Sequence, residues 1–378
     1  MSTHPVTVKP IDEVAKYKRT LIPAHIPDGY ALNPIFQGIA SADDIRNGVV
    51  AFRDFMYLFF DRLIKDGHLY AKPPKKPTGM ADYPFLNYIT NILVEIGYYG
   101  ILSESNDLLV VSKMPLCTAT VDENGKKKSA KIPASGLIES LRFLALCGFH
   151  FADTDLDAKT LSISQTQPLH VSYPDNPAIL VGLKALAVAD IERRNGRAYW
   201  NDHNLLRCNY RQLKVEESDI TDELKDFLHP LPENVQAFAL RLHQRYVNKG
   251  LTCTLSILDD TSFSYAVLTE RNKGLPVRDK YQKRIWAFSN SMRNGYSLFV
   301  RSKKTDKYTD VIKDFSPELQ TKITEGYGCY RKFGRERCQM DCQGIRLPLD
   351  DSILTFADDI ETWLDNEMPS SLKKQNSF

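Results

Sequence analysis

The feature that most constrains the fold of this chain is a pattern in which a helix-like segment ends at a glycine and a strand-like run follows. In PFLNYITNILVEIGYYG, apolar residues recur with helical spacing up to Gly97, and the run LLVV follows. The segment SGLIESLRFLALCG repeats the pattern up to Gly148, 51 positions further on, and Leu86 corresponds there to Leu137. This correspondence predicts two helix–strand units that share one sheet.

Two later segments follow the same pattern. NPAILVGLKALAVADIERRNG ends at Gly196 before LLRCNY, and ENVQAFALRLHQRYVNKG ends at Gly250 before LTCTLSIL. A glycine can adopt the left-handed conformation that ends a helix, so we expect a strand after each one. Because helix, glycine and strand also follow one another in many unrelated α+β chains, a true repeat and a coincidence of local signals both remain open.

A helix followed by a two-stranded wing would also suit a winged-helix DNA-binding protein. In TVDENGKKKSAK, Asn124 and Gly125 form a hairpin signal, and the three lysines after them would lie at the tip of such a wing, next to phosphate. A hairpin that is merely exposed to solvent carries the same residues, so both interpretations are kept.

From residue 250 onward the pattern favours strands. The runs LTCTLSIL, SFSYAVLTE, RIWAFSNS and YSLFVRSK are rich in β-branched and aromatic residues, and Asn294-Gly295 predicts a hairpin between the last two. Two helical patterns, the short strand GIRLPL and the terminal helix SILTFADDIETWLDNE follow. The predicted fold class is α+β, with an N-terminal region of repeated helix–strand units and a C-terminal antiparallel sheet packed with helices.

Changes in composition divide the chain into three regions. Residues 1–82 form an N-terminal helical region with the extended connector KPPKKPTG, residues 83–228 the helix–strand repeat domain, and residues 229–378 the C-terminal α+β domain. An acidic stretch precedes the second boundary, and Pro230 and Pro232 follow it, which favours an extended backbone there.

The order of elements in the C-terminal domain resembles a known family. Four strands, helices, the stretch IRLPLDDS and a closing helix follow one another over roughly residues 250–367, as in the small YjbR-type α+β domains. The stretch from GYGCYRK to DDSI is also similar to a family of uncharacterised bacterial proteins. These resemblances imply an α+β fold and a bacterial source, and they carry no activity to this chain.

Charge and cysteine content bear on where the chain works. The formal net charge is +2 over 378 residues, so any basic surface must be local. The first residues, MSTHPVTVKPIDEVAK, lack the apolar core of a signal peptide, and no uninterrupted apolar run of about 18 residues occurs. Seven cysteines, an odd number, do not suit a disulfide framework. We expect a cytoplasmic protein with reduced thiols and no membrane partner.

Familiar catalytic signatures do not occur in the sequence. G-x-G-x-x-G, G-x-x-x-x-G-K-[ST], H-E-x-x-H and G-x-S-x-G are all missing, so nucleotide-binding loops, zinc-protease sites and nucleophile elbows lack support. The sequence therefore leans toward a protein that is not an enzyme, with no catalytic residue and no cofactor other than a candidate zinc ion.

That candidate comes from the stretch GYGCYRKFGRERCQMDC, which contains Cys329, Cys338 and Cys342 among arginines and lysines. Nearby positive charges favour thiolates, and thiolates are ligands that zinc prefers. A fourth ligand would have to come from water or from Asp341, His229 or His243. The alternative is that the three cysteines are structural packing residues.

Basic residues gather on either side of the strand-like run RIWAFSNS. Those expected to contact nucleic acid are Arg271, Lys273, Arg278, Lys280, Lys283, Arg284, Lys303 and Lys304. The aromatic residues interleaved with them are Tyr281, Trp286, Tyr296 and Phe299, and a surface that contacts phosphates and stacks bases needs both charge and aromatic rings. The solvent face of an ordinary antiparallel sheet has a similar composition, so that interpretation also stands.

Two functional hypotheses result. The first is a non-enzymatic regulatory or nucleic-acid-binding protein that uses the basic C-terminal domain. The second is a metal-binding or thiol-redox protein, or an enzyme, centred on the cysteine cluster. The sequence favours the first, because a local concentration of positive charge is visible and a catalytic constellation is not.

Overall fold

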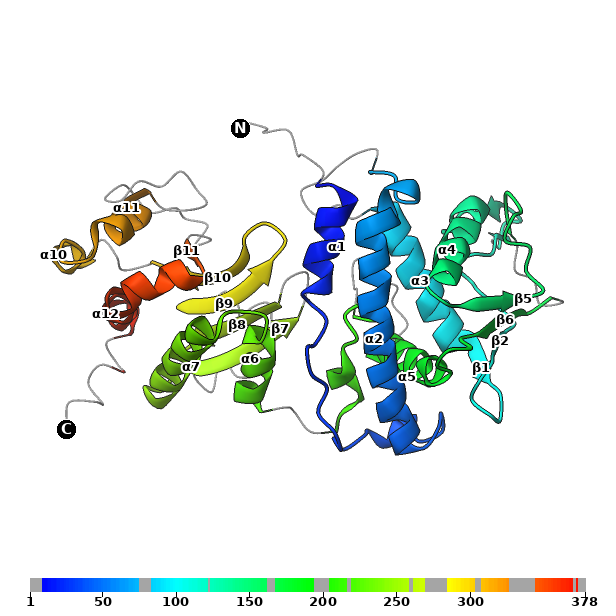
Figure 1. Ribbon diagram of the computed structural model, residues 1–378, viewed down its shortest axis with the longest axis horizontal. Coiled ribbons are helices and arrows are strands. Elements are labelled where there is room, and N and C mark those ends of the chain that lie inside the picture. The colour runs from blue at the N-terminus through cyan, green and yellow to red at the C-terminus, as the bar shows by residue number, and fades with distance from the viewer. Residues whose placement is uncertain are drawn as a thin grey trace. The chain divides into compact units, whose positions relative to one another are not determined.

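The computed structural model describes residues 9–74, 83–121, 123–161, 167–193, 204–215, 219–257, 261–268, 284–302, 307–325, 344–369 and 372. Its contacts divide the chain into two compact units, Met1–Glu217 and Ser218–Phe378. Both units combine helices with antiparallel strands, which confirms the predicted α+β class (Figure 1).

The division between the units lies before α6 (Ile220–Leu228), whereas the sequence suggests boundaries after residues 82 and 228. Helix α6 joins the second unit because Leu224 and Leu228 are buried in its hydrophobic core. In the first unit, residues before 82 supply α2 (Ala42–Asp66), which packs against α5 (Ala178–Arg193).

The first unit is built from helices, short strands and single turns of 3-10 helix (η). In chain order they are α1 (Ile11–Arg19), η1 (Pro34–Phe36), α2, η2 (Gly67–Leu69), α3 (Pro84–Tyr99), β1 (Gly100–Leu102), β2 (Leu109–Val111), β3 (Thr120–Val121), β4 (Lys127–Lys128), α4 (Ala134–Leu146), β5 (His150–Ala152), β6 (Leu169–Ser172), α5 and η3 (Tyr210–Leu213).

Helix α2 carries much of the aromatic core of the first unit. It begins where the Ser41 hydroxyl accepts a hydrogen bond from the amide of Asp44 at 3.1 Å, an N-cap that satisfies an otherwise unpaired donor. The Phe55 ring meets Phe149 edge-on at 5.1 Å and Tyr173 at 5.9 Å between centroids. These contacts join α2 to the segments that flank β5 and β6.

A four-stranded antiparallel sheet of order β1-β2-β6-β5 contains the two corresponding segments of the sequence. Each outer strand follows a helix, β1 after α3 and β5 after α4, and each then turns back into a central strand. In the central pair Leu109 lies opposite Val171, and Leu86 and Leu137 are both fully buried on the preceding helices. The two helix–hairpin segments thus hold equivalent places in one sheet.

Gly148 ends α4 as the sequence predicts. Its φ is +104°, its amide donates to the carbonyl of Ala145 at 3.0 Å, and the amide of Phe149 donates to the carbonyl of Leu144 at 3.1 Å. This pair of bonds is a Schellman cap, which needs the left-handed conformation that glycine adopts without strain. Gly250, with φ +90°, ends its helix in the same way.

Gly97 has a different role from the one predicted. It lies inside α3, which continues to Tyr99, and a Cβ atom on it would lie 2.7 Å from the Cβ of Ala187 in α5. The prediction that Gly97 ends the helix is therefore wrong, because close packing of two helices, and not a cap, requires glycine there. LLRCNY also differs from expectation, since it forms turns that lead into η3 and not a strand.

The second unit is built around a single sheet with helices before and after it. In chain order its elements are α6, α7 (Glu233–Asn248), β7 (Thr252–Ile257), β8 (Thr261–Ala266), β9 (Trp286–Ser291), β10 (Gly295–Val300), α10 (Thr309–Ile312), α11 (Pro317–Glu325), β11 (Ile345–Pro348), η5 (Asp351–Phe356) and α12 (Ala357–Glu367).

The five strands that the structure describes in the second unit form an antiparallel sheet of order β11-β10-β9-β8-β7. The β9–β10 hairpin turns at Gly295, with φ +59°, which confirms the hairpin predicted from Asn294-Gly295. Strand β7 belongs to this sheet, so the helix–strand segment around Gly250 does not extend the sheet of the first unit. Tyr265 of β8 and Trp286 of β9 stack in the core, with their ring centroids 3.6 Å apart and the rings almost parallel.

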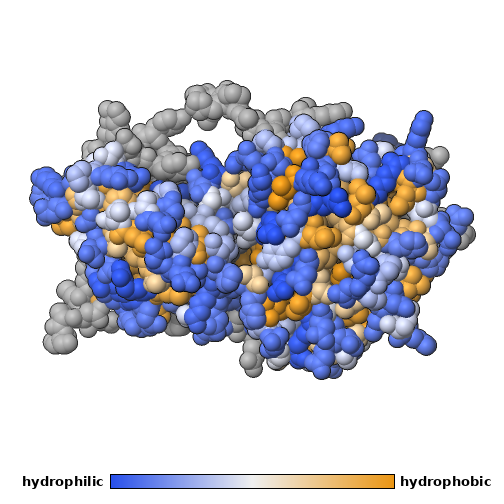
Figure 2. Space-filling view, viewed as in Figure 1, coloured by the Kyte–Doolittle hydropathy of each residue, from blue (hydrophilic) through white to orange (hydrophobic). Residues whose placement is uncertain are grey.

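Hydrophilic residues cover most of the face seen in Figure 2, with hydrophobic residues scattered between them. In the part of the chain that the structure describes, no helix has both the length and the apolar character needed to cross a bilayer. The large apolar side chains are mostly enclosed in the cores of the two units.

Candidate nucleic-acid interface

Most of the residues predicted to bind nucleic acid or metal lie outside the described residues. This is the case for Arg271, Lys273, Arg278, Lys280, Lys283, Lys303 and Lys304, and for Cys329, Cys338 and Cys342. Arg284 is described, and it stands two residues before the first residue of β9 (Trp286). Of the residues predicted to bind nucleic acid, Arg284 is the one that falls within the described part of the chain.

The sheet of the second unit has two chemically different faces, because successive side chains of a strand point to opposite sides. On one face, Phe263, Phe288, Leu298 and Leu347 lie in register across β8, β9, β10 and β11 and form part of the hydrophobic core. The opposite face, called here the serine face, consists of Ser262, Ser264, Ser289, Ser297, Phe299 and Arg346. The serine side chains on it are buried.

Arg346 of β11 is held on the serine face by two hydroxyl groups. Its Nη1 donates to Ser289 Oγ at 2.8 Å and is 3.4 Å from Ser297 Oγ. The two hydroxyls are themselves 3.2 Å apart, so they present a joint acceptor to the guanidinium. Among the described residues, no carboxylate lies within ion-pair distance of Arg346, which is only partly exposed.

Phe299 brings a second guanidinium next to the first. The guanidinium carbon of Arg284 lies 4.3 Å and that of Arg346 4.9 Å from the centroid of the Phe299 ring. The negative faces of an aromatic ring attract cations, so the ring offsets part of the repulsion between two neighbouring positive charges. The result is a pair of arginine residues, each partly exposed, that both contact the buried ring of Phe299.

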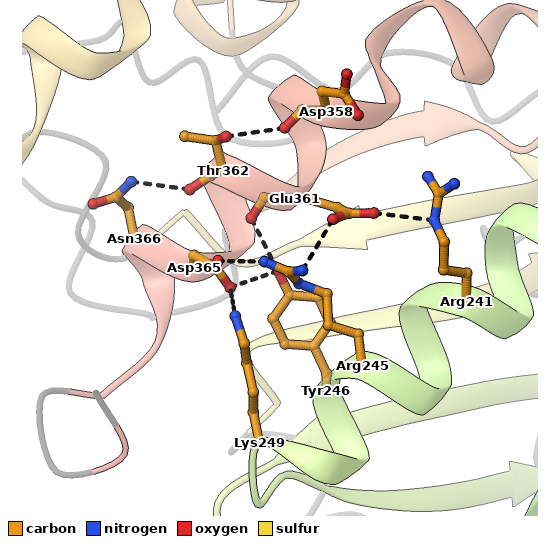
Figure 3. Close-up of polar contacts among 9 residues, drawn as sticks. All are labelled: Arg241, Arg245, Tyr246, Lys249, Asp358, Glu361, Thr362, Asp365 and Asn366. Atoms are coloured by element: carbon orange, nitrogen blue, oxygen red, sulfur yellow. Dashed lines mark hydrogen bonds and ion pairs between the residues drawn. The ribbon is translucent and has the colours of Figure 1, made fainter. Parts of the chain in front are cut away.

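The cations of α7 in the same unit, unlike Arg346, form ion pairs with carboxylates (Figure 3). Arg241 Nε lies 3.1 Å from Glu361, and Arg245 contacts both Glu361 and Asp365, at 3.3 and 2.8 Å. Lys249 Nζ lies 2.6 Å from Asp365. Two carboxylates of α12 thus pair with three cations of α7 and connect the two helices, so these cations are less available to a phosphate than Arg346 is.

His243, one of the candidates for a fourth metal ligand, forms hydrogen bonds with other side chains. Its Nδ1 lies 2.8 Å from the Tyr265 hydroxyl and its Nε2 3.2 Å from the Thr221 hydroxyl, so neither ring nitrogen is open to a metal ion. Burial lowers the pKa of His243, which favours the neutral ring. In the described part of the chain, no three His, Cys, Asp or Glu side chains gather as a metal site would require. The metal and thiol hypothesis, which depends on residues 329–342, stays a prediction.

The first unit offers little for a winged-helix mode of binding. Helix α3, which precedes the β1–β2 hairpin, is buried continuously from Ile89 to Gly97 and has no free face to enter a groove. The β1–β2 tip carries Glu104 and Asp107, and Ser103 and Ser105 donate to the Asp107 carboxylate. An acidic tip would repel phosphate. The lysine hairpin β3–β4 is a separate two-stranded element.

Sequence reasoning missed Arg346, Ser289 and Ser297, because it weighed clusters of charge and not strand register. The alternation of serine with aromatic residues in SFSYA and AFSNS was a usable signal for a sheet with one polar face. Trp286 was expected on a base-stacking surface, and that expectation is wrong. Its ring is fully buried on the core face, where the alternation of the strand places it.

Comparison with models of known protein families, with curated proteins and with solved structures finds no match to this chain. The YjbR-type resemblance therefore stays a prediction.

Proposed function

We propose that the protein is a non-enzymatic nucleic-acid-binding protein and that Arg284 and Arg346 contact the phosphate backbone from the serine face of the second unit. The observation that carries the proposal is Arg346, a partly buried guanidinium that two serine hydroxyls hold without a carboxylate partner among the described residues.

A charge removed from water is costly unless an opposite charge or hydrogen bonds replace the lost hydration. Serine hydroxyls satisfy one nitrogen of Arg346, and no carboxylate among the described residues balances its positive charge. Guanidinium groups bind phosphate through paired N–H donors, and two of them flank Phe299. A phosphodiester would supply the missing negative charge.

The proposal is tested by fluorescence anisotropy with labelled single-stranded DNA of about 20 nucleotides and with a duplex of the same length, at about 50 to 200 mM salt. We expect affinity to fall steeply with salt, because bound phosphates release counterions. Arg346→Gln should weaken binding and reduce the slope of log affinity against log salt by about 0.7 to 0.9. Arg346→Lys, which keeps the charge, should retain most of the slope.

Arg241→Gln is the matched control, because it removes one positive charge of the same unit that already forms an ion pair with Glu361. It should leave the slope unchanged. Circular dichroism and thermal unfolding of each variant separate a loss of binding from a loss of fold. Absence of binding by the wild-type protein at the lowest salt would overturn the proposal.

A further inference from the structure

The lysine hairpin of the first unit is a charged element that the proposed function does not use. Thr120 pairs with Lys128 and Val121 with Lys127, and Gly125 adopts φ +74° at the turn between them. Between residues 113 and 131 the sequence has five lysines against two acidic residues. Four of these lysines are exposed in the described part of the chain: Lys113, Lys126, Lys128 and Lys131.

The base of this hairpin is fixed to the body of the first unit. The amide of Ile132 donates to the carbonyl of Leu116 at 2.9 Å, which closes the loop that carries the lysines. The amide of Leu116 donates in turn to Glu95 Oε1 at 2.8 Å, on the buried face of α3. Met114 and Ile132, on either side of the loop, are fully buried. The lysines therefore project from a rigid base.

A further contact positions the first lysine of the group. The ammonium of Lys113 lies 4.8 Å from the centroid of the Tyr99 ring, at the C-terminal end of α3. This contact restrains a side chain that would otherwise be free to rotate, and it keeps positive charge beside the base of the hairpin. Lysine ammonium groups act on phosphate as point charges without base preference, so this element suits a backbone contact.

We propose that the β3–β4 hairpin is a second contact with the phosphate backbone of nucleic acid, made by Lys126 and Lys128 and positioned by the Glu95–Leu116 anchor. The inference rests on the proposed function of the second unit. It adds a site in the first unit that acts through charge alone, so the complete chain binds nucleic acid through both units.

The test compares the full-length protein with the double variant Lys126→Gln/Lys128→Gln, on the same labelled single strand and duplex. Each phosphate contact contributes about 0.7 to 0.9 to the salt slope, so the double variant should lose about 1.4 to 1.8 of it and bind less tightly. Because both side chains are exposed, thermal unfolding should not change.

The matched control is Lys16→Gln/Lys313→Gln, which changes the net charge equally. Each of these lysines is exposed and already paired with an aspartate, Asp12 or Asp310. The control should keep the wild-type slope.

The outcomes separate the two proposals. If Arg346→Gln lowers the slope and Lys126→Gln/Lys128→Gln does not, the hairpin inference is wrong and the proposed function stands. The hairpin inference is also overturned if the control lowers the slope as much as the hairpin variant, because net charge alone would then explain the loss. If the wild-type protein does not bind at all, the proposed function fails, and the inference that rests on it fails too.

Discussion

Gly48 of α2 and Gly182 of α5 face each other where the two helices cross. A Cβ atom on Gly48 would lie 2.6 Å from the amide nitrogen of Gly182 and 2.7 Å from the carbonyl oxygen of Ala178. Both are backbone atoms, so no side-chain rotation could make room. This crossing brings the aromatic residues of α2 into the core of the first unit, and it requires glycine at both positions.

We expect Gly182→Ala to destabilise the first unit, because the added methyl group forces the helices apart. Overpacking of this kind costs about 1 to 3 kcal/mol of unfolding free energy, even though alanine itself favours a helix. Urea denaturation measures the loss. Gly38→Ala is the control, since a Cβ there meets no atom within 4 Å. Equal stability of the two variants would contradict the role assigned to the crossing.

The burial of Glu95 should make the unfolding free energy of the first unit depend on pH. Burial raises the pKa of this carboxyl to about 7, against the opposing influence of the Leu116 amide, the Cys117 thiol and Lys131. The folded state then binds more protons than the unfolded state between about pH 4.5 and 7, so this group lowers the unfolding free energy as the pH rises through that window.

Glu95→Gln removes that charge and keeps an oxygen for the Leu116 amide. The variant should gain on the order of 2 kcal/mol over wild type at pH 8 and little at pH 5. Urea denaturation at both pH values measures the difference, with the exposed Glu104→Gln as control. A stability difference that is the same at pH 5 and pH 8 would rule out titration of Glu95 in this range.

The burial of His243 should make the stability of the second unit depend on pH with the opposite sign. Burial lowers its pKa from 6.5, with Asp219 opposing the shift, so the folded state binds fewer protons than the unfolded state below about pH 6.5. Stability should therefore fall as the pH drops through that value. In His243→Gln this contribution disappears, and the loss of the hydrogen bond between His243 and the Tyr265 hydroxyl costs about 1 to 3 kcal/mol at all pH values.

The measurement is the unfolding free energy between pH 5 and 7.5 for wild type, for His243→Gln and for His150→Gln, an exposed histidine. Only His243→Gln should have a flatter profile. An unchanged profile in that variant would show that the buried ring does not titrate during unfolding.

The ion pairs of Asp365 should stabilise the packing of α12 by an amount that depends on salt. Its burial would raise its pKa, but hydrogen bonds from Lys249, Arg245 and Tyr246 outweigh this and lower it. Its stabilising effect is present above pH 3.8 and is lost as the pH falls below that value. Because the group is partly exposed, we expect Asp365→Asn to cost only about 1 to 2 kcal/mol at pH 7, and less in high salt.

Asp310→Asn is the appropriate comparison for Asp365→Asn, because Asp310 pairs with Lys313 on an open surface. Thermal unfolding in low and high salt should reveal a clear loss only for Asp365→Asn. Equal, small effects of both substitutions would mean that the α7–α12 ion pairs add nothing beyond ordinary surface charge.

Several features could be read from the sequence because they depend on neighbours along the chain. Gly148 and Gly250 end their helices as predicted, and Asn294-Gly295 turns the β9–β10 hairpin. Gly97 carries a similar local signal but serves helix packing. The signal is ambiguous because glycine is required both at the end of a helix and where a second helix packs closely. The sequence around the glycine does not show which of the two applies.

The sequence by itself determined the α+β class and the positions of most helices and hairpins, and it suggested, without deciding, the correspondence between the segments around Gly97 and Gly148. These follow from hydrophobic periodicity and local backbone preference, which act within a few residues. Only the tertiary structure decided that Arg346 meets Ser289 and Ser297, that Trp286 faces the core, and that Glu95 anchors the lysine hairpin. Strand register and burial create these relationships between residues far apart in the chain, and no local pattern records them.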